Sequence, residues 1–370
     1  MSFSSSNSSV ILINASSPSL THINNILIDD APECQYVAGK QKNRAKDLPK
    51  ELKKLEYKTI HWGQRKLLLS EIEFLLLCME KGKKGEDYNV LYPGSARGDH
   101  IPLLYKYFKP TFHLYDPAPF CDELTKNSIN GGIYKINEHK DSKLPIGFFT
   151  DEVAKIYSDS TKYKNVLFIS DIRLPPSNIT KEDTGYSEKF QDNVAEDMSR
   201  QKKWVEMINP IASLLKLCFQ YDCTTTLNYF EGNIHHQAWA PSTSTEKRLM
   251  VVNVNKNKDY LPIKYERQSA FFNVYQRMMD MSNVDINFNN EIPIKGKFKD
   301  IWNQYGVIVG ADCYMETLII YKLIVYLGEE LTITNIVKYI DEFSLHIYPK
   351  VNPKYAFQYK IKLNKIKRKE

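Results

Sequence analysis

The sequence predicts an α/β fold with a mainly parallel central sheet and helices on both faces. Two patterns carry this prediction: short apolar runs of strand length alternate with longer runs of helix length, and several apolar runs end in Gly or Asp. The 370 residues are 42% hydrophobic and 25% charged, a composition that excludes a chain disordered throughout. At roughly 150 residues per domain, this length allows two domains, or one large α/β domain with appended segments.

The first half of the chain predicts two helices and two strands. Apolar residues at helical spacing predict an amphipathic helix over 63–81, and they are Leu67, Leu68, Ile72, Leu75, Leu76 and Met79. An apolar strand over 88–92 follows and runs into a turn with Gly94 and Gly98. A helix over 101–108 then leads into a second strand, over 111–115, which ends at Asp116.

The second half continues the alternation. A strand over 165–170 ends at Asp171, and a long polar helix over 188–208 stops at Asn209-Pro210. A strand over 212–219 contains Lys216, and further strands are predicted over 224–229 and 248–253. Helices over 265–281 and 312–327 close the predicted order. Helical connections of this length favour parallel pairing, because parallel strands need a long crossover between them.

Charge and composition set the two ends apart. We expect residues 1–35 to form a Ser- and Asn-rich flexible arm, 36–350 a single domain with C-terminal helices, and 351–370 a basic tail. Residues 40–66 hold ten basic and three acidic side chains, and residues 354–370 hold seven and one, in a chain of net charge +6. Such concentrated positive charge is typical of proteins that contact a polyanion such as nucleic acid. The alternative is that both segments are solvated ends.

Several functional classes are excluded at this stage. No apolar stretch reaches the roughly 20 residues needed to cross a bilayer. The six cysteines are scattered without a C-x-x-C pair, which argues against structural zinc and a disulfide framework and favours a reducing, intracellular setting. His235-His236 lacks Cys or carboxylate neighbours at ligand spacing, so no metal site is predicted.

The ends of the first two strands predict a nucleoside site. In an open parallel sheet, ligands bind beyond the carboxyl ends of the strands. Gly94 to Gly98 supplies small residues for close approach, and Asp116, about 20 positions further on, is suited to bind the two hydroxyls of a ribose. The three-glycine dinucleotide pattern is missing, so S-adenosylmethionine fits better than NAD. A tight turn capped by Asp116 is the structural alternative.

Five sequence blocks occur in order between residues 57 and 280. They are HWGQRKLLL (61–69), PGSARGDH (93–100), ISDIR (169–173), INPIASLLK (208–216) and QAWAPSTSTEKRL (237–249). Together they resemble the poxvirus family of cap-specific mRNA (nucleoside-2′-O-)-methyltransferases, which also serve as the small regulatory subunit of the viral poly(A) polymerase. The resemblance implies a Rossmann-like, S-adenosylmethionine-dependent methyltransferase fold.

By this resemblance the catalytic tetrad falls on Lys66, Asp171, Lys216 and Glu246. A ribose 2′-hydroxyl must lose its proton as it attacks the sulfonium methyl group. Lys216 breaks an apolar run, so it is either an edge lysine facing water or a buried, partnered one. A buried lysine near a second cation can serve as a base, oriented here by the two carboxylates. Arg173 and Arg248 match family positions on the RNA side and support those carboxylates.

The resemblance also implies a cofactor site and a cap site. The cofactor residues are Gln64, Gly94, Ser95, Gly98, His100, Asp116 and Asp171. The family has Pro and Thr where this chain has Arg97 and Asp99, and its D-G-R is Asp116-Pro117-Ala118, so Arg97 is a candidate substitute for the missing arginine. Cap recognition needs aromatic faces and carboxylates. The candidates are Glu266, Phe219 or Tyr221, and Asp222, while the family's tyrosine is Thr243.

The sequence therefore predicts a cap-specific mRNA 2′-O-methyltransferase that acts on the first transcribed nucleotide of capped mRNA. The alternative is a non-catalytic, RNA-binding regulatory or processivity subunit of a viral poly(A) polymerase, with the catalytic subunit as its partner. The departures at Arg97, Asp99, Ala118 and Thr243 favour this alternative. A cytoplasmic location, in a virion or viral factory, follows from the resemblance, and the Asn-, Lys-, Ile- and Tyr-rich composition suits an AT-rich viral genome.

Overall fold

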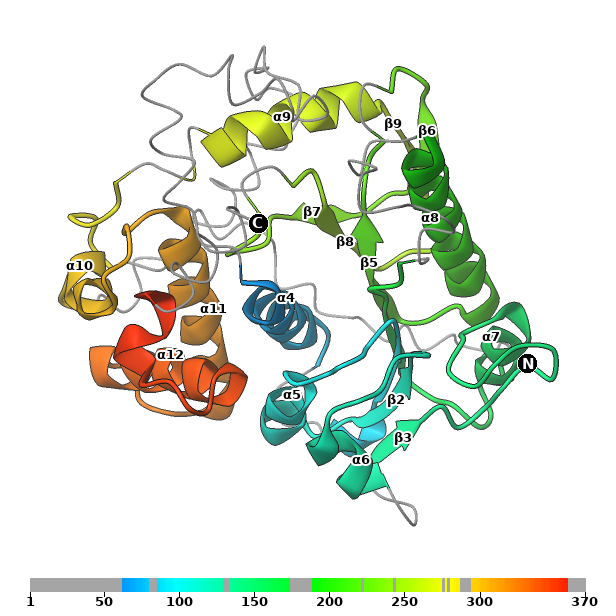
Figure 1. Cartoon of the computed structure of the whole chain (residues 1–370), viewed down its shortest axis with the longest axis horizontal. Helices are drawn as coiled ribbons and strands as arrows, with labels where there is room; N and C mark the ends of the chain where they lie inside the picture. Colours follow the sequence, from blue (N-terminus) through cyan, green and yellow to red (C-terminus); the bar gives the residue numbers. More distant parts are fainter. Residues whose placement is uncertain are drawn as a thin grey trace, which may run out of the picture.

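A computed structural model describes residues 62–79, 85–128, 133–173, 188–220, 223–241, 244–274, 277, 280–286 and 294–358. The predicted arm at 1–35, residues 40–61 of the basic segment and residues 359–370 of the basic tail lie outside this part of the chain. The described part is built on a seven-stranded sheet in the order β3-β2-β1-β4-β5-β8-β7 (Figure 1).

Parallel pairing dominates the sheet. The parallel strands are β1 (Asn89–Pro93), β2 (Thr111–Tyr115), β3 (Tyr134–Ile136), β4 (Val166–Ile169) and β5 (Ala212–Leu217). Strand β8 (Lys247–Val251) pairs antiparallel with β5, and β7 (Asn233–His235) pairs antiparallel with β8. The predicted mainly parallel, Rossmann-like sheet is therefore confirmed. The strand predicted over 224–229 is β6 (Leu227–Phe230), which lies outside this sheet in an antiparallel pair with β9 (Asn257–Tyr260).

Helices cover both faces of the sheet, as predicted (Figure 1). One core contains side chains of α4 (Gly63–Cys78), α5 (Ile101–Phe108), α6 (Asp122–Ser128), α10 (Phe298–Trp302), α11 (Ala311–Leu327) and α12 (Ile333–Ile347). The core on the other face contains those of α7 (Asp151–Tyr157) and α8 (Glu188–Ile208). Because both faces are covered, strands such as β4 and β5 are buried along their length and read as apolar runs.

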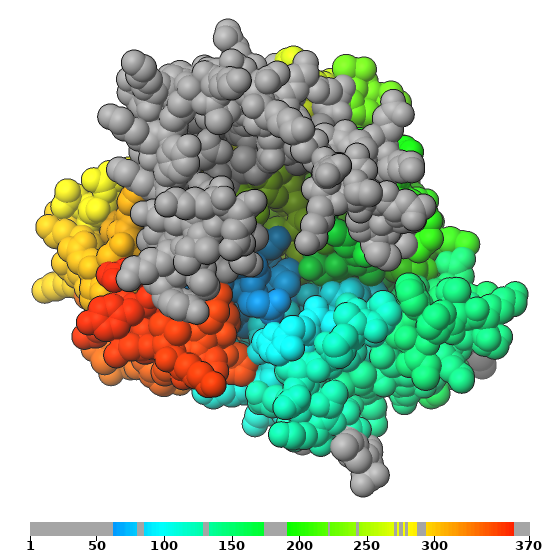
Figure 2. All heavy atoms as spheres, in the orientation of Figure 1, coloured from blue at the N-terminus to red at the C-terminus, as the bar shows by residue number. Residues whose placement is uncertain are grey.

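Helix α4 differs from the amphipathic helix that the sequence predicts. It lies between the sheet and α11, and Figure 2 shows it (blue) between the C-terminal helices (orange to red) and residues 85–173 (cyan to green). A helix covered on both sides has little solvent-facing surface. Arg65, Glu71 and Glu73 are therefore buried as well, and each has a polar partner: Glu316 for Arg65, His100 for Glu71 and His235 for Glu73.

Other differences concern six short elements and one helix near the C-terminus. The sequence analysis did not predict β3, β7, β9, α6, α7 or α10, which have three to seven residues each. It also ended the helical part at 327, whereas α12 follows, capped by the Thr332 hydroxyl, which accepts the Asn335 N–H (3.1 Å). Among the described residues, no helix is long and apolar enough to span a membrane.

Candidate active site

The sheet topology brings distant residues to one edge. Gly94 follows β1, Asp171 follows β4, and Lys216 lies near the end of β5. Because β8 runs antiparallel to β5, with Lys216 opposite Arg248, the residue that precedes β8 also lies at this edge. That residue is Glu246. The carboxyl ends of parallel strands at a change in strand order, here between β1 and β4, are where such sheets bind ligands.

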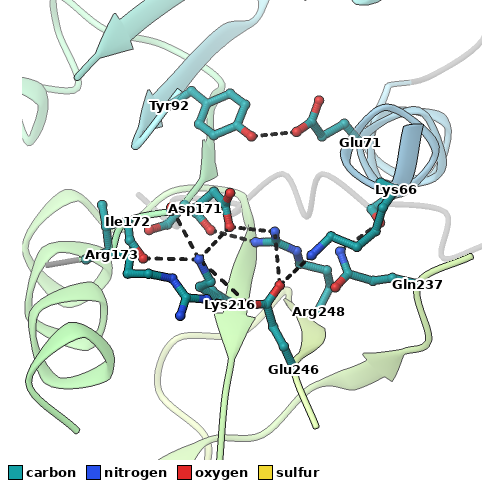
Figure 3. A network of polar contacts seen from close by, with 12 residues as sticks. Lys66, Glu71, Tyr92, Asp171, Ile172, Arg173, Lys216, Gln237, Glu246 and Arg248 are labelled. Carbon is teal, nitrogen blue, oxygen red and sulfur yellow. Dashed lines mark hydrogen bonds and ion pairs between the residues drawn. The ribbon is translucent and has the colours of Figure 1, made fainter. Parts of the chain in front are cut away.

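All four predicted catalytic side chains meet at this edge (Figure 3). Lys66, from the first turn of α4, places its Nζ 2.7 Å from Glu246 Oε1. The Nζ of Lys216 lies 2.8 Å from Asp171 Oδ1 and 3.8 Å from Glu246 Oε2. Strand β5 is internal and Lys216 is buried, so of the two alternatives the buried, partnered lysine is correct. The Asp171 side chain keeps 21% exposure, so the cluster borders solvent.

Two arginines complete the cluster. Arg248 is buried, and its Nη2 lies 2.7 Å from Asp171 Oδ1 while its Nη1 donates to the carbonyl oxygen of Ser170 (2.9 Å). Arg173 is half exposed and places its Nη2 3.0 Å from Glu246 Oε2. Each carboxylate therefore contacts at least one lysine and one arginine.

The surrounding cations keep both carboxylates ionised. Burial by itself raises the pKa of Asp171, but the ammonium of Lys216 and the guanidinium of Arg248 outweigh it and hold that pKa well below its usual value. Burial is likewise outweighed at Glu246, where Lys66 and Lys216 keep the pKa well below the ordinary range. Two negative charges therefore offset the cations of the cluster at neutral pH.

A glutamine that the sequence analysis missed fixes the backbone of Lys216. The pairing of β4 with β5 ends at Ile169 and Leu214, so the backbone of Lys216 lies beyond it. The buried carboxamide of Gln201, on α8, takes the place of a strand: its Oε1 accepts the Lys216 N–H (3.1 Å), and its Nε2 donates to the Lys216 carbonyl (3.2 Å). Gln201 stands in a polar helix among lysines, so its sequence context gives no signal.

Arg65, the residue before Lys66, is buried among the C-terminal helices. The guanidinium of Arg65 lies over the rings of Trp62 (4.8 Å) and Phe357 (4.9 Å). Its Nε donates to Glu316 Oε2 of α11 (2.9 Å), and its Nη1 donates to the Ser344 hydroxyl of α12 (2.9 Å). These contacts tie the start of α4 to the C-terminal helices. A basic residue inside a basic segment gives no sign of such burial.

The turn after β1 packs closely against the backbone that follows β4. Gly94 has φ +79°, and a Cβ there would lie 2.6 Å from the backbone carbonyl carbon of Asp171. Asp116 is half buried, and its two oxygens accept the N–H groups of Ala96 (3.1 Å) and Ala118 (2.8 Å), so the capping role given as its alternative is present. The hydroxyl of Ser95 is buried without a hydrogen-bond partner among the described residues. An orphaned hydroxyl beside a glycine turn fits a nucleoside ligand.

The remaining predicted cofactor residues form a buried chain behind this turn. His100 Nδ1 lies 3.0 Å from Gln64 Oε1, and His100 Nε2 lies 2.8 Å from Glu71 Oε2. Tyr92, at the end of β1, donates its hydroxyl to Glu71 (Figure 3), and burial raises the pKa of Tyr92 well above its usual value, so the hydroxyl stays protonated. Glu71 and Tyr92 were not predicted.

Gly98 and Arg97 are two further positions in the glycine turn. Gly98 has φ +71°. Arg97, the candidate substitute for the family's arginine, is 67% exposed and pairs with Asp99 (3.2 Å). In this structure its charge is thus engaged by its neighbour two residues on.

The predicted cap residues are described only in part. Phe219, just beyond β5, is buried and stacks on Tyr265, with ring centroids 4.9 Å apart and planes at 19°. Glu266 follows Tyr265 on α9 (Pro262–Val274) and is also buried. The two segments therefore lie together, with Tyr265 against Phe219. Tyr221, Asp222 and Thr243 lie outside the described residues.

Each histidine of the pair contacts one protein side chain. His235 Nδ1 lies 3.3 Å from Glu73 Oε2, and the ring of His236 stacks on Phe272. Within the described ranges, no group of three or more His, Cys, Asp or Glu side chains is arranged to hold a metal ion.

Comparison with known proteins places this chain in a family. The family model described as "Poly A polymerase regulatory subunit" matches residues 34–316. The Cap-specific mRNA (nucleoside-2′-O-)-methyltransferase of Fowlpox virus (strain NVSL) is 28% identical over 242 residues, which cover 61% of this chain and 71% of that protein. The protein of the same name from Myxoma virus (strain Lausanne) is 28% identical over 207 residues, covering 55% of this chain and 56% of that protein. The chain belongs to the poly(A) polymerase regulatory subunit family.

Proposed function

We propose that this chain is an S-adenosylmethionine-dependent methyltransferase that acts on the ribose 2′-hydroxyl of the first transcribed nucleotide of capped RNA. The meeting of Lys66, Asp171, Lys216 and Glu246 at the ligand-binding edge of the sheet carries the proposal. The names of the viral relatives agree with it.

The cofactor would lie across the ends of β1, β2 and β4. Gln64, Gly94, Ser95, Gly98, His100, Asp116 and Asp171 are the residues that would hold it. Bound there, S-adenosylmethionine supplies an electrophilic methyl group. Asp116 has lone pairs beyond the two that accept backbone N–H groups, and these would accept the ribose hydroxyls. Ser95 would pair its orphaned hydroxyl with the same ligand.

Lys216 is the base of the proposed reaction. Its Nζ also lies 3.4 Å from the carbonyl oxygens of Asp171 and Ile172, so four oxygens hold it in place at the site. In its neutral form it would accept the proton of the 2′-hydroxyl. Asp171 and Glu246 would stabilise the ammonium that forms, and Lys66 would balance the charge of Glu246. Positioning of the attacking oxygen supplies the rest of the acceleration.

Capped RNA would enter from the side of Arg173 and α9. Glu266 with Phe219 or Tyr221, and Asp222, are the proposed cap residues, and the half-exposed Arg173 is available to a phosphate. Arg65 is buried and Lys66 belongs to the catalytic cluster, so the other basic residues of 40–66 would track the RNA backbone.

The description of the matching family favours a second candidate function. In this role the chain would be the regulatory subunit of a poly(A) polymerase, would bind RNA and would associate with the polymerase's catalytic subunit. The two roles are compatible, because methyl transfer needs only the site at the sheet edge.

A methyl-transfer assay with matched RNAs tests the proposal. The chain is incubated with labelled S-adenosylmethionine and an RNA that is either capped or uncapped. Label should appear in the capped RNA, and the linkage after its first nucleotide should resist alkali, because alkaline cleavage requires a free 2′-hydroxyl. Label on a base, or equal labelling of both RNAs, would contradict the assigned position or cap dependence. RNA binding without any transfer would leave the regulatory role.

A further inference from the structure

A second polar cluster, made of two cations and a histidine, joins β8 to α9 next to the active site. His235 pairs with Arg248, so the next residues in register, His236 and Lys247, project to the same face. Both meet Phe272 of α9: the His236 ring stacks on it with centroids 3.7 Å apart, and Lys247 Nζ lies 5.5 Å from its centroid. Arg277, three residues beyond α9, interacts electrostatically with both.

The three side chains of this cluster are buried, and polar atoms of two of them lack a hydrogen-bond partner among the described residues. Lys247 and Arg277 are only 4% and 2% exposed, and His236 is buried as well. Asp312 accepts from Arg277 Nε (2.7 Å), and in the described part of the chain Nη1 and Nη2 have no hydrogen-bond partner. Within the described ranges neither ring nitrogen of His236 has a hydrogen-bond partner, and burial with the nearby cations holds the pKa of His236 well below its usual value, so its ring is neutral and offers one N–H. Among the described residues Lys247 forms no ion pair, and its ammonium makes a cation–π contact with the ring of Phe272.

Buried donors without a hydrogen-bond partner indicate a bound ligand. Buried charges are normally paired, and orphaned buried donors in folded proteins mark a bound water or ion. Asp312 balances Arg277, so the ammonium of Lys247 is left in excess. An anion with several oxygens would accept hydrogen bonds from the donors and would also balance the charge of Lys247. The free edge of a guanidinium can bind a phosphate in a bidentate manner.

We propose that Lys247, Arg277 and His236 form a binding site for a phosphate group. The site adjoins the proposed RNA site, because Lys247 follows Glu246 and because Asn273 of α9 donates to the Ser244 carbonyl (2.9 Å) just before it. The phosphate is therefore assigned to the backbone of RNA. This assignment to RNA rests on the proposed function, whereas binding of inorganic phosphate does not.

Thermal unfolding of the full chain tests the site without any activity readout. The unfolding midpoint is measured at pH 6.5 in increasing inorganic phosphate, against chloride at matched ionic strength. The midpoint of the wild type should rise with phosphate, because a ligand of the folded state stabilises it. Lys247→Met should unfold no lower than the wild type in chloride, since it removes an unpaired buried cation, and its affinity for phosphate should fall at least tenfold.

Control variants separate this site from general effects of charge. Lys258→Met, at an exposed position of β9, should keep the full response to phosphate. Arg277→Lys keeps the charge but removes the fork, and should weaken the response. A wild type that responds equally to phosphate and chloride, or a Lys247→Met that responds like the wild type, would overturn the site and indicate a hydrated cluster.

A final experiment distinguishes RNA from free phosphate. Saturating uncapped RNA should abolish the increment that phosphate adds to the midpoint, because a backbone phosphate would already occupy the site. An increment that persists would overturn the assignment to RNA and leave a site for free phosphate. Neither result depends on methyl transfer, so failure of the proposed enzyme and failure of this site are distinguishable.

Discussion

Two neighbouring lysines on different strands have opposite surroundings. Lys216 lies among two carboxylates and two carbonyl oxygens, whereas Lys247 faces Arg277 and an aromatic ring. Burial, with the nearby charge of Arg277, lowers the pKa of Lys247 to about 7 from 10.5, and Glu246 only partly opposes this. The charge of Lys216 is balanced by nearby carboxylates. Burial of the charged Lys247 lowers the stability of the fold unless an anion binds beside it.

This cost predicts a pH dependence of stability. The pKa of Lys247 is about 7 in the folded chain and 10.5 as the ordinary value that applies to the unfolded chain. Between these values the unfolded state binds more protons, so stability should rise as the pH rises from about 7 toward 10.5. Lys247→Met should flatten this rise in unfolding midpoints measured without phosphate, and Lys258→Met should preserve it. An unchanged slope in Lys247→Met would show that another group titrates.

Residues in motifs were the ones that the sequence could predict. Lys66, Asp171, Lys216 and Glu246 stand in blocks whose order is itself a signal, and the structure brings them together. Glu71, Tyr92, Gln201 and Arg65 could not be found, because a polar residue on a helix or strand reads the same whether it is solvated or buried with a partner. Only the tertiary structure shows that partner.

At the scale of elements, α8 acts on the site through one side chain. Gln201 satisfies the N–H and the carbonyl of Lys216 where β4 no longer pairs with β5. Gln201→Met would orphan both groups, at about 1–3 kcal/mol each. We expect a lower free energy of unfolding and, for enzyme that remains folded, a turnover reduced more than the KM is changed, because Lys216 loses its fixed position.

Denaturant unfolding and steady-state methyl transfer measure these two effects. Arg200→Gln is the matched control on α8, because Arg200 forms an exposed pair with Glu196 and should change stability by less than about 0.5 kcal/mol. Gln201→Met with wild-type turnover would show that the glutamine supports the fold alone.

The predictability of the elements depends on length and apolarity. Strands β1, β2, β4 and β5 are buried on both faces, so they stand out as apolar runs. Strands β3 and β7 have three residues each, too few to show a period. Helix α12 begins with β-branched residues, Ile333 and the capping Thr332, which favour a strand by propensity. Packing against α11 overrides that preference.

At the scale of the whole molecule, the C-terminal helices are joined to the site through α4. Arg65, beside Lys66, pairs with Glu316 of α11 and with Ser344 of α12, and all three side chains are buried. We propose on this basis that residues 36–350 unfold as a single domain. The sequence analysis gave 36–350 as one domain, but the contacts that join its parts could not be read from the sequence, because they link positions more than 250 residues apart.

Breaking this pair tests the proposed single domain. Arg65→Met leaves Glu316 buried without its partner, which costs about 3–5 kcal/mol. The variant should unfold at a lower midpoint, still in one transition by both circular dichroism and tryptophan fluorescence. The double variant Arg65→Met/Glu316→Gln should recover part of the loss. Two separate transitions in the single variant would contradict a cooperative domain.

The central claim is that the cluster at the sheet edge performs methyl transfer with Lys216 as its base. Single-turnover transfer to capped RNA, measured for the wild type and Lys216→Met with RNA binding followed in parallel, tests it most directly. We predict that Lys216→Met binds RNA as the wild type does and transfers methyl groups about 10²- to 10⁴-fold more slowly, the range that a positioned base contributes. An unchanged rate in Lys216→Met would contradict the assignment of the base.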